Sequence, residues 1–316
     1  MIVRGLLFLL PLALWAYVFI NQRVPRKEIT ASFLGFVWAF HSVLILNVAL
    51  VYNGIWQPLI QDNLFYGVPL DWVFSQAIII GALVPLGRLL GVSSAARHLA
   101  QVGMIVLIYY AAGLAFSGFN AAMIVISVYA FCATLAMALS DWTASDTCIR
   151  ARSALQALAW ATLLLWLFPS TVFYLTMNSW NAILQRDVVT TALYLLPLLI
   201  PAGLLMGALY QFAIEGDGTA FPYDPPKRLV TGGVYQYLSN PMQVGICLMM
   251  FWWGVVIQSM WITISAIIAV ILFIVFKDVC NGSCAIGKGN KEWEAYQQTV
   301  PKWIPRFKAE LTSNKG

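Results

Sequence analysis

The stretch Glu215–Gln243, EGDGTAFPYDPPKRLVTGGVYQYLSNPMQ, interrupts an otherwise very apolar sequence. Its glycines, prolines and charged residues favour turns and irregular loops over a helix that crosses a membrane. The two hundred residues before it consist of long apolar runs joined by short polar connections. The sequence therefore predicts a compact polar loop at this point, and binding or chemistry is expected there.

The composition places the rest of the chain in a membrane. Of the 316 residues, 61% are hydrophobic and only 10% are charged, and the mean hydropathy is +0.79. Soluble domains are about 45–50% apolar and about 25% charged. Because lipid leaves unpaired backbone groups unsatisfied, the spans are expected to be helices. The predicted fold class is an all-α integral membrane protein with several spans.

The apolar runs give the number of spans, since about 20 apolar residues cross the hydrocarbon core. The run after the polar loop, 244–276, is too long for one crossing and carries Gln258-Ser259 at its middle, which predicts a tight helical hairpin. With this C-terminal hairpin, about nine transmembrane helices are expected. The chain is expected to divide into an N-terminal transmembrane bundle, 1–190, and a second membrane domain with a tail, 191–316. The other predicted spans lie near 3–20, 30–51, 70–90, 102–118, 121–139, 154–177 and 189–213.

Lysine and arginine indicate the orientation of these spans, because cytoplasmic loops are enriched in both. If the spans alternate from an outside N-terminus, only Arg4 and Arg186 among the 18 lysines and arginines fall outside. The polar loop 215–243 and the C-terminal tail are then both cytoplasmic. The net charge of +5 is explained by basic loops that face anionic lipid, and no nucleic-acid partner is expected.

Two ordered patterns in the C-terminal third resemble a known family. The first is Gly216-x-Gly218-Thr219-x-x-Pro222-x-x-Pro225-Pro226-x-x-Leu229-Val230-x-x-Gly233-x-Tyr235-x-x-x-x-Asn240-Pro241-Met242. The second is Glu292-Trp293-x-x-Tyr296-x-x-x-Val300-Pro301-x-x-Ile304-Pro305. Together they are similar to the membrane methyltransferases grouped around isoprenylcysteine carboxyl methyltransferase and the phospholipid methyltransferases. The resemblance covers roughly 195–307, and the first six spans do not share it.

The resemblance implies a cofactor and a reaction. In that family the loop, the hairpin ends and the tail surround S-adenosylmethionine at the cytoplasmic membrane surface, while a lipophilic substrate enters from the bilayer. It implies methyl transfer to a lipid or another lipophilic acceptor, with membrane lipids as partners and no metal. It names no catalytic residue. The cofactor-binding residues that it implies are Gly233, Tyr235, Tyr237, Ser239, Asn240, Pro241, Gln243 and Glu292.

Elementary chemistry agrees with this role for the loop. Glycines let backbone amides approach a ligand closely, and the start of a helix offers unpaired N–H groups to a carboxylate. Asn240 is a good N-cap residue, and Pro241 at the first helical position loses no hydrogen bond. A plain helix cap is the alternative interpretation of these two residues.

The sequence also departs from the family. The family usually has arginine where Gln236 stands, and its pair of glutamates falls at about Asn281-Gly282, so that acidic pair is absent. Cys280 and Cys284 flank this position. They are interpreted as two thiols without function, and a redox pair and a pair of metal ligands are the alternatives. Two other functions stay open: an NADPH-dependent membrane reductase of a lipophilic substrate, and a non-enzymatic protein that binds a lipid or a partner.

Polar residues in the first six spans call for separate interpretations. His41 lies mid-span and is expected to be a neutral histidine hydrogen-bonded between helices, with a catalytic base as the alternative. Arg97 lies at an inside boundary and is expected to anchor the orientation. The charged residues of the following inside connection are expected to be solvated and paired locally; they are Asp141, Asp146, Arg150 and Arg152.

Overall fold

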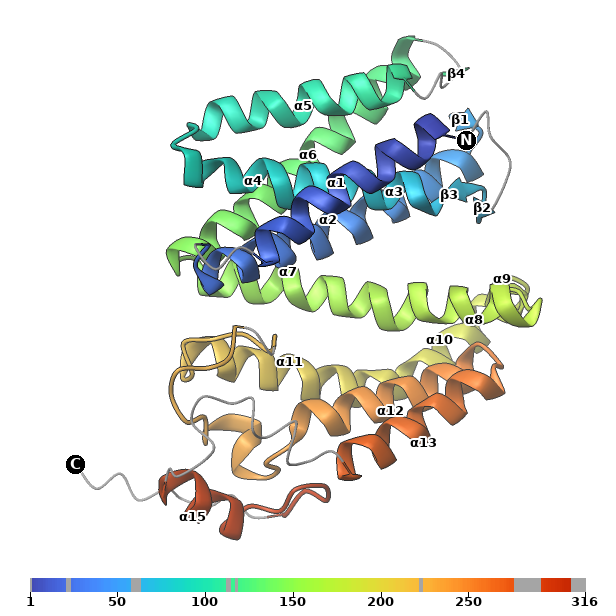
Figure 1. Ribbon diagram of the computed structural model, residues 1–316. Coiled ribbons are helices and arrows are strands. Elements are labelled where there is room, and N and C mark those ends of the chain that lie inside the picture. The colour runs from blue at the N-terminus through green and yellow to red at the C-terminus, as the bar shows by residue number, and fades with distance from the viewer. Residues whose placement is uncertain are drawn as a thin grey trace. The chain divides into compact units, whose positions relative to one another are not determined.

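The protein is described here from a computed structural model, which is mostly helical (Figure 1). The structure describes residues 2–20, 24–57, 64–111, 115–116, 119–221, 224–275 and 291–307. Backbone contacts divide the chain into unit 1, residues 1–148, and unit 2, residues 149–316. This division by contacts lies earlier in the chain than the predicted boundary at 190. The predicted boundary separates two functional domains, and it stays a prediction.

Unit 1 is a helical bundle with α2 at its centre. The helix α2 packs against α6 and against the helix that contains α3 and η1, and α1 packs on the latter helix as well. Short antiparallel strand pairs, β1 with β4 and β2 with β3, close the connections. The elements are α1 (Ile2–Ile20), α2 (Arg26–Tyr52), β1 (Trp56–Gln57), β2 (Leu64–Phe65), β3 (Val68–Pro69), α3 (Leu70–Ala77), η1 (Ile78–Leu83), α4 (Val84–Leu86), η2 (Gly87–Leu90), α5 (Ser94–Ala111), β4 (Ala115–Phe116) and α6 (Phe119–Ser145).

Small residues let the two central helices of unit 1 approach closely. A side chain on Gly81 would meet Ala39 Cβ and the Gly35 carbonyl oxygen, each at 2.5 Å. A side chain on Gly35 would in turn collide with the Gly81 carbonyl oxygen. Such backbone-to-backbone approach is how membrane helices gain packing energy where lipid weakens the hydrophobic drive between them.

Unit 2 contains the polar loop and the C-terminal tail. Here α11 packs against α7 and α12, and α12 packs against α13. The elements are α7 (Ile149–Thr162), η3 (Leu163–Leu167), α8 (Phe168–Thr176), α9 (Asn181–Leu184), α10 (Val188–Leu195), η4 (Leu196–Leu198), α11 (Leu199–Ile214), η5 (Gly233–Gln236), α12 (Pro241–Val256), α13 (Met260–Val275) and α15 (Lys291–Thr299).

A proline widens the helix formed by α7, η3 and α8. Pro169 has no N–H, and its ring would clash with the carbonyl four residues earlier. The chain adopts the π-helical turn η3 just before it. The carbonyl oxygen of Leu165, four residues before Pro169, accepts a hydrogen bond from Trp253 Nε1 at 2.9 Å. The acceptor freed by the proline is therefore used to attach α12.

The apolar run 244–276 is broken where the sequence places Gln258-Ser259. The helix α12 ends at Val256 and α13 begins at Met260, and the two lie side by side (Figure 1). Gln258 adopts the left-handed conformation, with φ at 54°. A side chain on Gly254 would lie 2.6 Å from Thr263 N, so glycine permits this close turn. That both helices cross a membrane stays a prediction, as does the total of nine spans.

The described residues include five helices long and apolar enough to cross a membrane. They support an integral membrane protein, and shorter apolar helices are found at Leu9–Ile20, Pro241–Val256 and Met260–Leu272. The span predicted at 102–118 is not among these five, since α5 runs from Ser94 to Ala111 and Ala115–Phe116 form strand β4. The first turns of α5 carry polar residues that hydropathy excludes from a span. The five helices are Arg26–Tyr52, Leu70–Leu90, Ala122–Ser145, Ile149–Thr176 and Val188–Ile214.

Candidate functional site

The carboxylate of Glu215 organises the polar loop between α11 and α12. Glu215 Oε1 accepts a hydrogen bond from Thr231 N at 3.0 Å, and Oε2 accepts one from Gly232 N at 3.0 Å. Gln211, one helical turn earlier on α11, donates from Nε2 to the same Oε2 at 2.7 Å. Hydrogen bonds to a carboxylate are stronger than those between neutral groups. One side chain thus ties the second half of the loop to the end of α11.

The first half of the loop folds back on itself. The carbonyl oxygen of Gly216 accepts from Lys227 N at 2.7 Å, and Thr219 N donates to the carbonyl oxygen of Asp224 at 3.0 Å. A side chain on Gly218 would lie 2.6 Å from the carbonyl oxygen of Pro225. Glycine at this position is therefore required by packing within the loop. Pro222 and Tyr223 lie outside the described residues.

A buried arginine holds this half of the loop on α7. Arg152 forms an ion pair and hydrogen bond through Nη2 with Asp224 Oδ2. The Arg152 side chain is 1% exposed and that of Asp224 is 17% exposed. The prediction that Arg152 is solvated and paired locally was wrong, because its partner lies 72 residues further along the chain. A buried guanidinium needs a carboxylate or several acceptors, and the polar loop supplies the carboxylate.

The segment from Gly233 to Tyr237 packs on α11 by its aromatic residue. Gly233 has a φ of +55°, a conformation that favours glycine, and begins the short helix η5. Tyr235 is buried and stacks on Phe212, with ring centroids 5.3 Å apart and an interplanar angle of 13°. Ala208 and Val230 complete this small core. The buried tyrosine fixes where the following turn meets α12.

The C-terminal tail docks on the backbone of this same segment. Tyr296 donates its hydroxyl hydrogen to the carbonyl oxygen of Tyr235 at 2.7 Å. Ser239 N donates to the carbonyl oxygen of Pro301 at 2.9 Å. Arg306 donates from Nε to the carbonyl oxygen of Gln236 at 2.8 Å and from its backbone N to that of Tyr237 at 3.1 Å. The two sequence patterns, far apart in the chain, therefore meet in one structure.

We predict that alkali loosens this docking. Burial raises the pKa of Tyr296 above its ordinary value of 10.0; Arg306 lowers it and Glu215 raises it further. Because docking raises this pKa, the protonated tyrosine favours the docked tail. This stabilisation is complete below the ordinary pKa and decreases as the pH rises from the ordinary pKa toward the pKa of the docked state. Limited proteolysis of the tail should stay constant between pH 7 and 9 and increase above pH 10.0.

Tyr296→Phe provides the control for this titration. It removes both the ionisable group and one neutral hydrogen bond, which contributes about 0.5–1.5 kcal/mol. The variant tail should be cut faster at neutral pH, with a smaller increase in alkali than the wild type shows. An equal increase in both proteins would assign the alkaline loosening to another group.

The start of α12 offers backbone donors to an anion. Pro241 is the first helical residue, and the carbonyl oxygen of Asn240 accepts from Val244 N at 3.2 Å. The side chain of Asn240 forms no cap hydrogen bond, so the predicted capping role is not seen. The amides of Met242 and Gln243 belong to the first turn, where no intrahelical acceptor exists. This end carries the positive end of the helix dipole.

The residues implied by the resemblance fall into two groups. Tyr235, Ser239 and Pro241 are buried and serve the structure of the loop and tail. The second group is exposed or partly exposed; it contains Gly233, Tyr237, Asn240, Gln243 and Glu292. The position of the missing acidic pair, Asn281-Gly282, lies outside the described residues, as do Cys280 and Cys284.

The sequence interpretation missed the two residues that hold the site together. Glu215 stands at the end of an apolar helix, four residues after Gln211, and this spacing could have indicated a pair on one helix face. Arg306 follows the second sequence pattern directly, and nothing in its local sequence announces that it reaches Gln236 and Tyr237. Among the described residues, no group of three or more His, Cys, Asp or Glu is placed to hold a metal ion.

Comparison with known proteins gives a match to a family model. The family model described as phospholipid methyltransferase matches residues 198–280. No curated protein and no solved structure matches the chain. The matched residues begin at the end of η4 and include α11, the polar loop, α12 and α13. The family predicted from the two sequence patterns is confirmed for this region: residues 198–280 carry the sequence pattern of the phospholipid methyltransferases, a family of membrane methyltransferases.

Proposed function

We propose that this protein transfers a methyl group from S-adenosylmethionine to a lipid or another lipophilic acceptor at the cytoplasmic face of a membrane. The domain responsible is 191–316, with the polar loop 215–243 and the tail forming the donor site. The observation that carries the proposal is the docking of the tail on residues 235–239, within the region matched by the family model.

The chemistry of these residues fits the methyl donor. S-adenosylmethionine carries a carboxylate, and the first-turn amides of α12 are suited to bind one. Asn240 leaves its side-chain amide uncommitted to the helix cap and partly exposed. Gly233 places backbone without a side chain beside Gln211. Tyr237, 40% exposed, offers an aromatic surface.

The reaction makes few demands on catalytic side chains. The donor, when bound, supplies an activated methyl group on a sulfonium. The protein has to align this methyl group with the acceptor atom and to exclude water. The fixed backbone of residues 232–241 serves the alignment, since Glu215 and the docked tail hold it from two sides. A general base is required only where the acceptor begins protonated, and we assign no residue to that role.

Binding of the methyl donor tests the proposal. Calorimetry on the protein in detergent should show saturable binding of S-adenosylmethionine, and Asn240→Ala should weaken it at least tenfold while leaving the thermal midpoint unchanged. Asn53→Ala is the matched control, because Asn53 is an exposed asparagine of unit 1. Absence of saturable binding to the wild type would refute the proposal.

The same titration separates the other candidate functions. A reductase would bind NADPH in preference to the methyl donor. A non-enzymatic lipid-binding protein would bind neither cofactor and would retain a native lipid through purification. Either result would replace the proposed function.

A further inference from the structure

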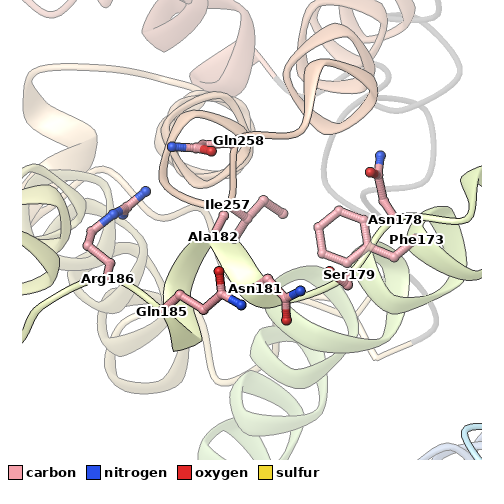
Figure 2. A pocket seen from close by; sticks show the side chains of 9 residues that line it. All are labelled: Phe173, Asn178, Ser179, Asn181, Ala182, Gln185, Arg186, Ile257 and Gln258. Atoms are coloured by element: carbon pink, nitrogen blue, oxygen red, sulfur yellow. The ribbon is translucent and has the colours of Figure 1, made fainter.

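A cavity opens in unit 2 at the ends of several helices. It lies where α8 gives way to α9 and where α12 turns into α13, and its volume is about 480 Å³. Figure 2 shows side chains from both stretches of chain around it. Pockets for small ligands commonly measure about 300–1,000 Å³. The cavity is therefore large enough for a polar group of moderate size.

The lining of this cavity is rich in hydrogen-bond donors. Four side-chain amides line it, from Asn178, Asn181, Gln185 and Gln258, together with the guanidinium-bearing Arg186. The lining includes no carboxylate. Amides donate and accept, whereas a guanidinium only donates and carries a positive charge at all pH values of interest. The complement to this set is an anion with several acceptor oxygens.

Arg186 is held in place by two contacts, while one of its guanidinium nitrogens has no hydrogen-bond partner among the described residues. Its Nη2 donates to the carbonyl oxygen of Val256 at 3.1 Å, and its guanidinium carbon lies 4.3 Å from the centre of the Tyr194 ring. Its Nη1 is buried and has no hydrogen-bond partner among the described residues. The neighbouring Asp187 directs Oδ1 to Thr190 N at 2.9 Å, where it caps α10. A buried N–H without a partner calls for an acceptor, and a guanidinium pairs strongly with phosphate oxygens.

Several tryptophans lie close to this cavity along the chain, as expected for a site at the level of lipid headgroups. Trp252 and Trp253 lie in the last turns of α12, Trp261 follows at the start of α13, and Trp180 precedes α9. Tryptophan is enriched at membrane–water interfaces. The orientation predicted from lysine and arginine puts Arg186 on the side of the membrane opposite the polar loop.

The cavity is far from the proposed methyl-donor site. The helix α12 runs from Pro241 at the polar loop to Val256 beside the cavity, and its 16 residues measure about 24 Å at 1.5 Å per residue. Methyl transfer requires direct contact of donor and acceptor. A ligand in the cavity is therefore not the acceptor of that reaction.

We propose that this cavity binds the phosphate group of an anionic phospholipid, with the Arg186 guanidinium as the charged donor and the four amides as neutral donors. The bound lipid fastens α9 to the α12–α13 turn from the membrane side, since the donors come from both. The proposal does not depend on methyltransferase activity.

Lipid titration of the delipidated protein tests this site. Phosphatidylglycerol, added in detergent and followed by native mass spectrometry, should bind saturably to the wild type, and Arg186→Gln should weaken binding at least tenfold. Arg186→Lys keeps the charge, and its affinity for phosphatidylglycerol should lie between those of the wild type and Arg186→Gln. Arg150→Gln is the matched control, because Arg150 is an exposed arginine of the same unit and should bind as the wild type does.

Two further ligands identify the source of the phosphate. Diacylglycerol with the same acyl chains should not compete, and equal binding of it would overturn the proposal. Inorganic phosphate that competes at millimolar concentration would support the anion site and assign it to free phosphate. Because Arg186→Gln also loses the bond to Val256, Asn181→Leu and Gln185→Leu serve as second variants. Unchanged phosphatidylglycerol affinity in folded versions of all three would overturn the proposal.

Discussion

Asp224→Ala is expected to lower the free energy of unfolding by about 3–5 kcal/mol, the usual cost of removing one partner of a buried ion pair. The Arg152 side chain is 1% exposed and keeps its charge when the carboxylate is removed. Asp224 also accepts a hydrogen bond at Oδ2 from Thr219 Oγ1 at 3.2 Å. The first half of the polar loop should therefore detach from α7. Unfolding in detergent, followed by tryptophan fluorescence, measures the loss.

The same loop provides a control for this substitution. Lys227 and Asp217 form an ion pair at 3.2 Å with side chains 50% and 48% exposed. Exposed pairs of this kind contribute about 0–1 kcal/mol, so Lys227→Ala should leave the unfolding transition nearly unchanged. Equal losses for Asp224→Ala and Lys227→Ala would show that burial of Arg152 does not determine the effect.

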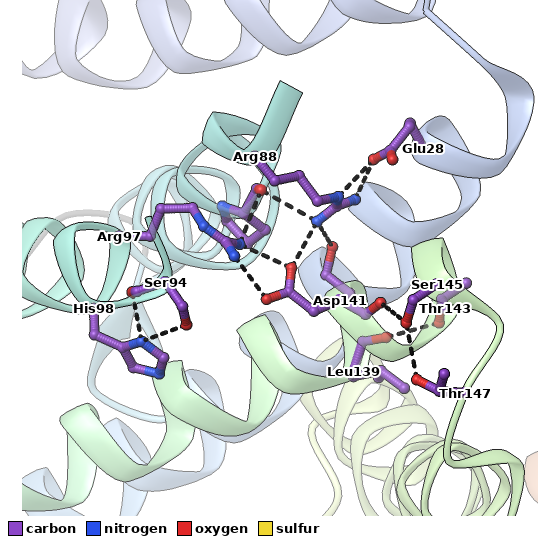
Figure 3. A network of polar contacts seen from close by, with 12 residues as sticks. Glu28, Arg88, Ser94, Arg97, His98, Leu139, Asp141, Thr143, Ser145 and Thr147 are labelled. Carbon is purple, nitrogen blue, oxygen red and sulfur yellow. Dashed lines mark hydrogen bonds and ion pairs between the residues drawn. The ribbon is translucent and has the colours of Figure 1, made fainter. Parts of the chain in front are cut away.

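The second large effect is expected from Asp141→Ala in unit 1. Asp141 on α6 accepts hydrogen bonds from Arg97 Nη1 and Nη2, both at 2.8 Å, and from Arg88 Nη1 at 3.0 Å (Figure 3). Arg88 also pairs with Glu28 on α2. Charged side chains from four helices thus form one network, in which Asp141 accepts from both arginines. Its removal should cost about 3–5 kcal/mol, because two largely buried guanidinium groups lose their shared partner.

A nearby exposed pair again serves for comparison. Lys27 Nζ lies 3.9 Å from Asp146 Oδ2, with side chains 51% and 31% exposed. Lys27→Ala should change the free energy of unfolding by less than about 1 kcal/mol. A loss below that value for Asp141→Ala would mean that Arg88 and Arg97 find other acceptors, such as the carbonyl oxygen of Pro85.

Hydropathy predicted helices well where apolar residues occupy most of their length. The span predicted at 70–90 agrees with the helix Leu70–Leu90, and that at 189–213 with Val188–Ile214. It missed the first turns of α5, which contain Arg97 and Gln101, because the predicted span began only at residue 102. Gln101 Nε2 donates to the carbonyl oxygens of Ile80 and Ala133, so its polarity is satisfied inside the bundle. No window over a single segment contains these partners.

The partners of charged residues could not be predicted from a single segment either. The prediction that Asp141 and Arg152 are solvated and paired locally was wrong, since their partners lie 44 and 72 residues away. Local sequence gives the sign and place of a charge, whereas its partner depends on which helices pack together. For the candidate site, the resemblance predicted that loop and tail belong together. The side chains that join them, Tyr296 and Arg306, had to be found in the structure.

The tail binds residues 235–237 through backbone atoms, and this has a consequence for which side chains can change there. At Tyr235, Gln236 and Tyr237 the tail bonds to carbonyl oxygens, which every amino acid possesses. A substitution at position 236 therefore leaves the hydrogen bond from Arg306 to this carbonyl oxygen in place. The side chains of Gln236 and Tyr237 can therefore vary while the tail continues to hold the backbone that presents them.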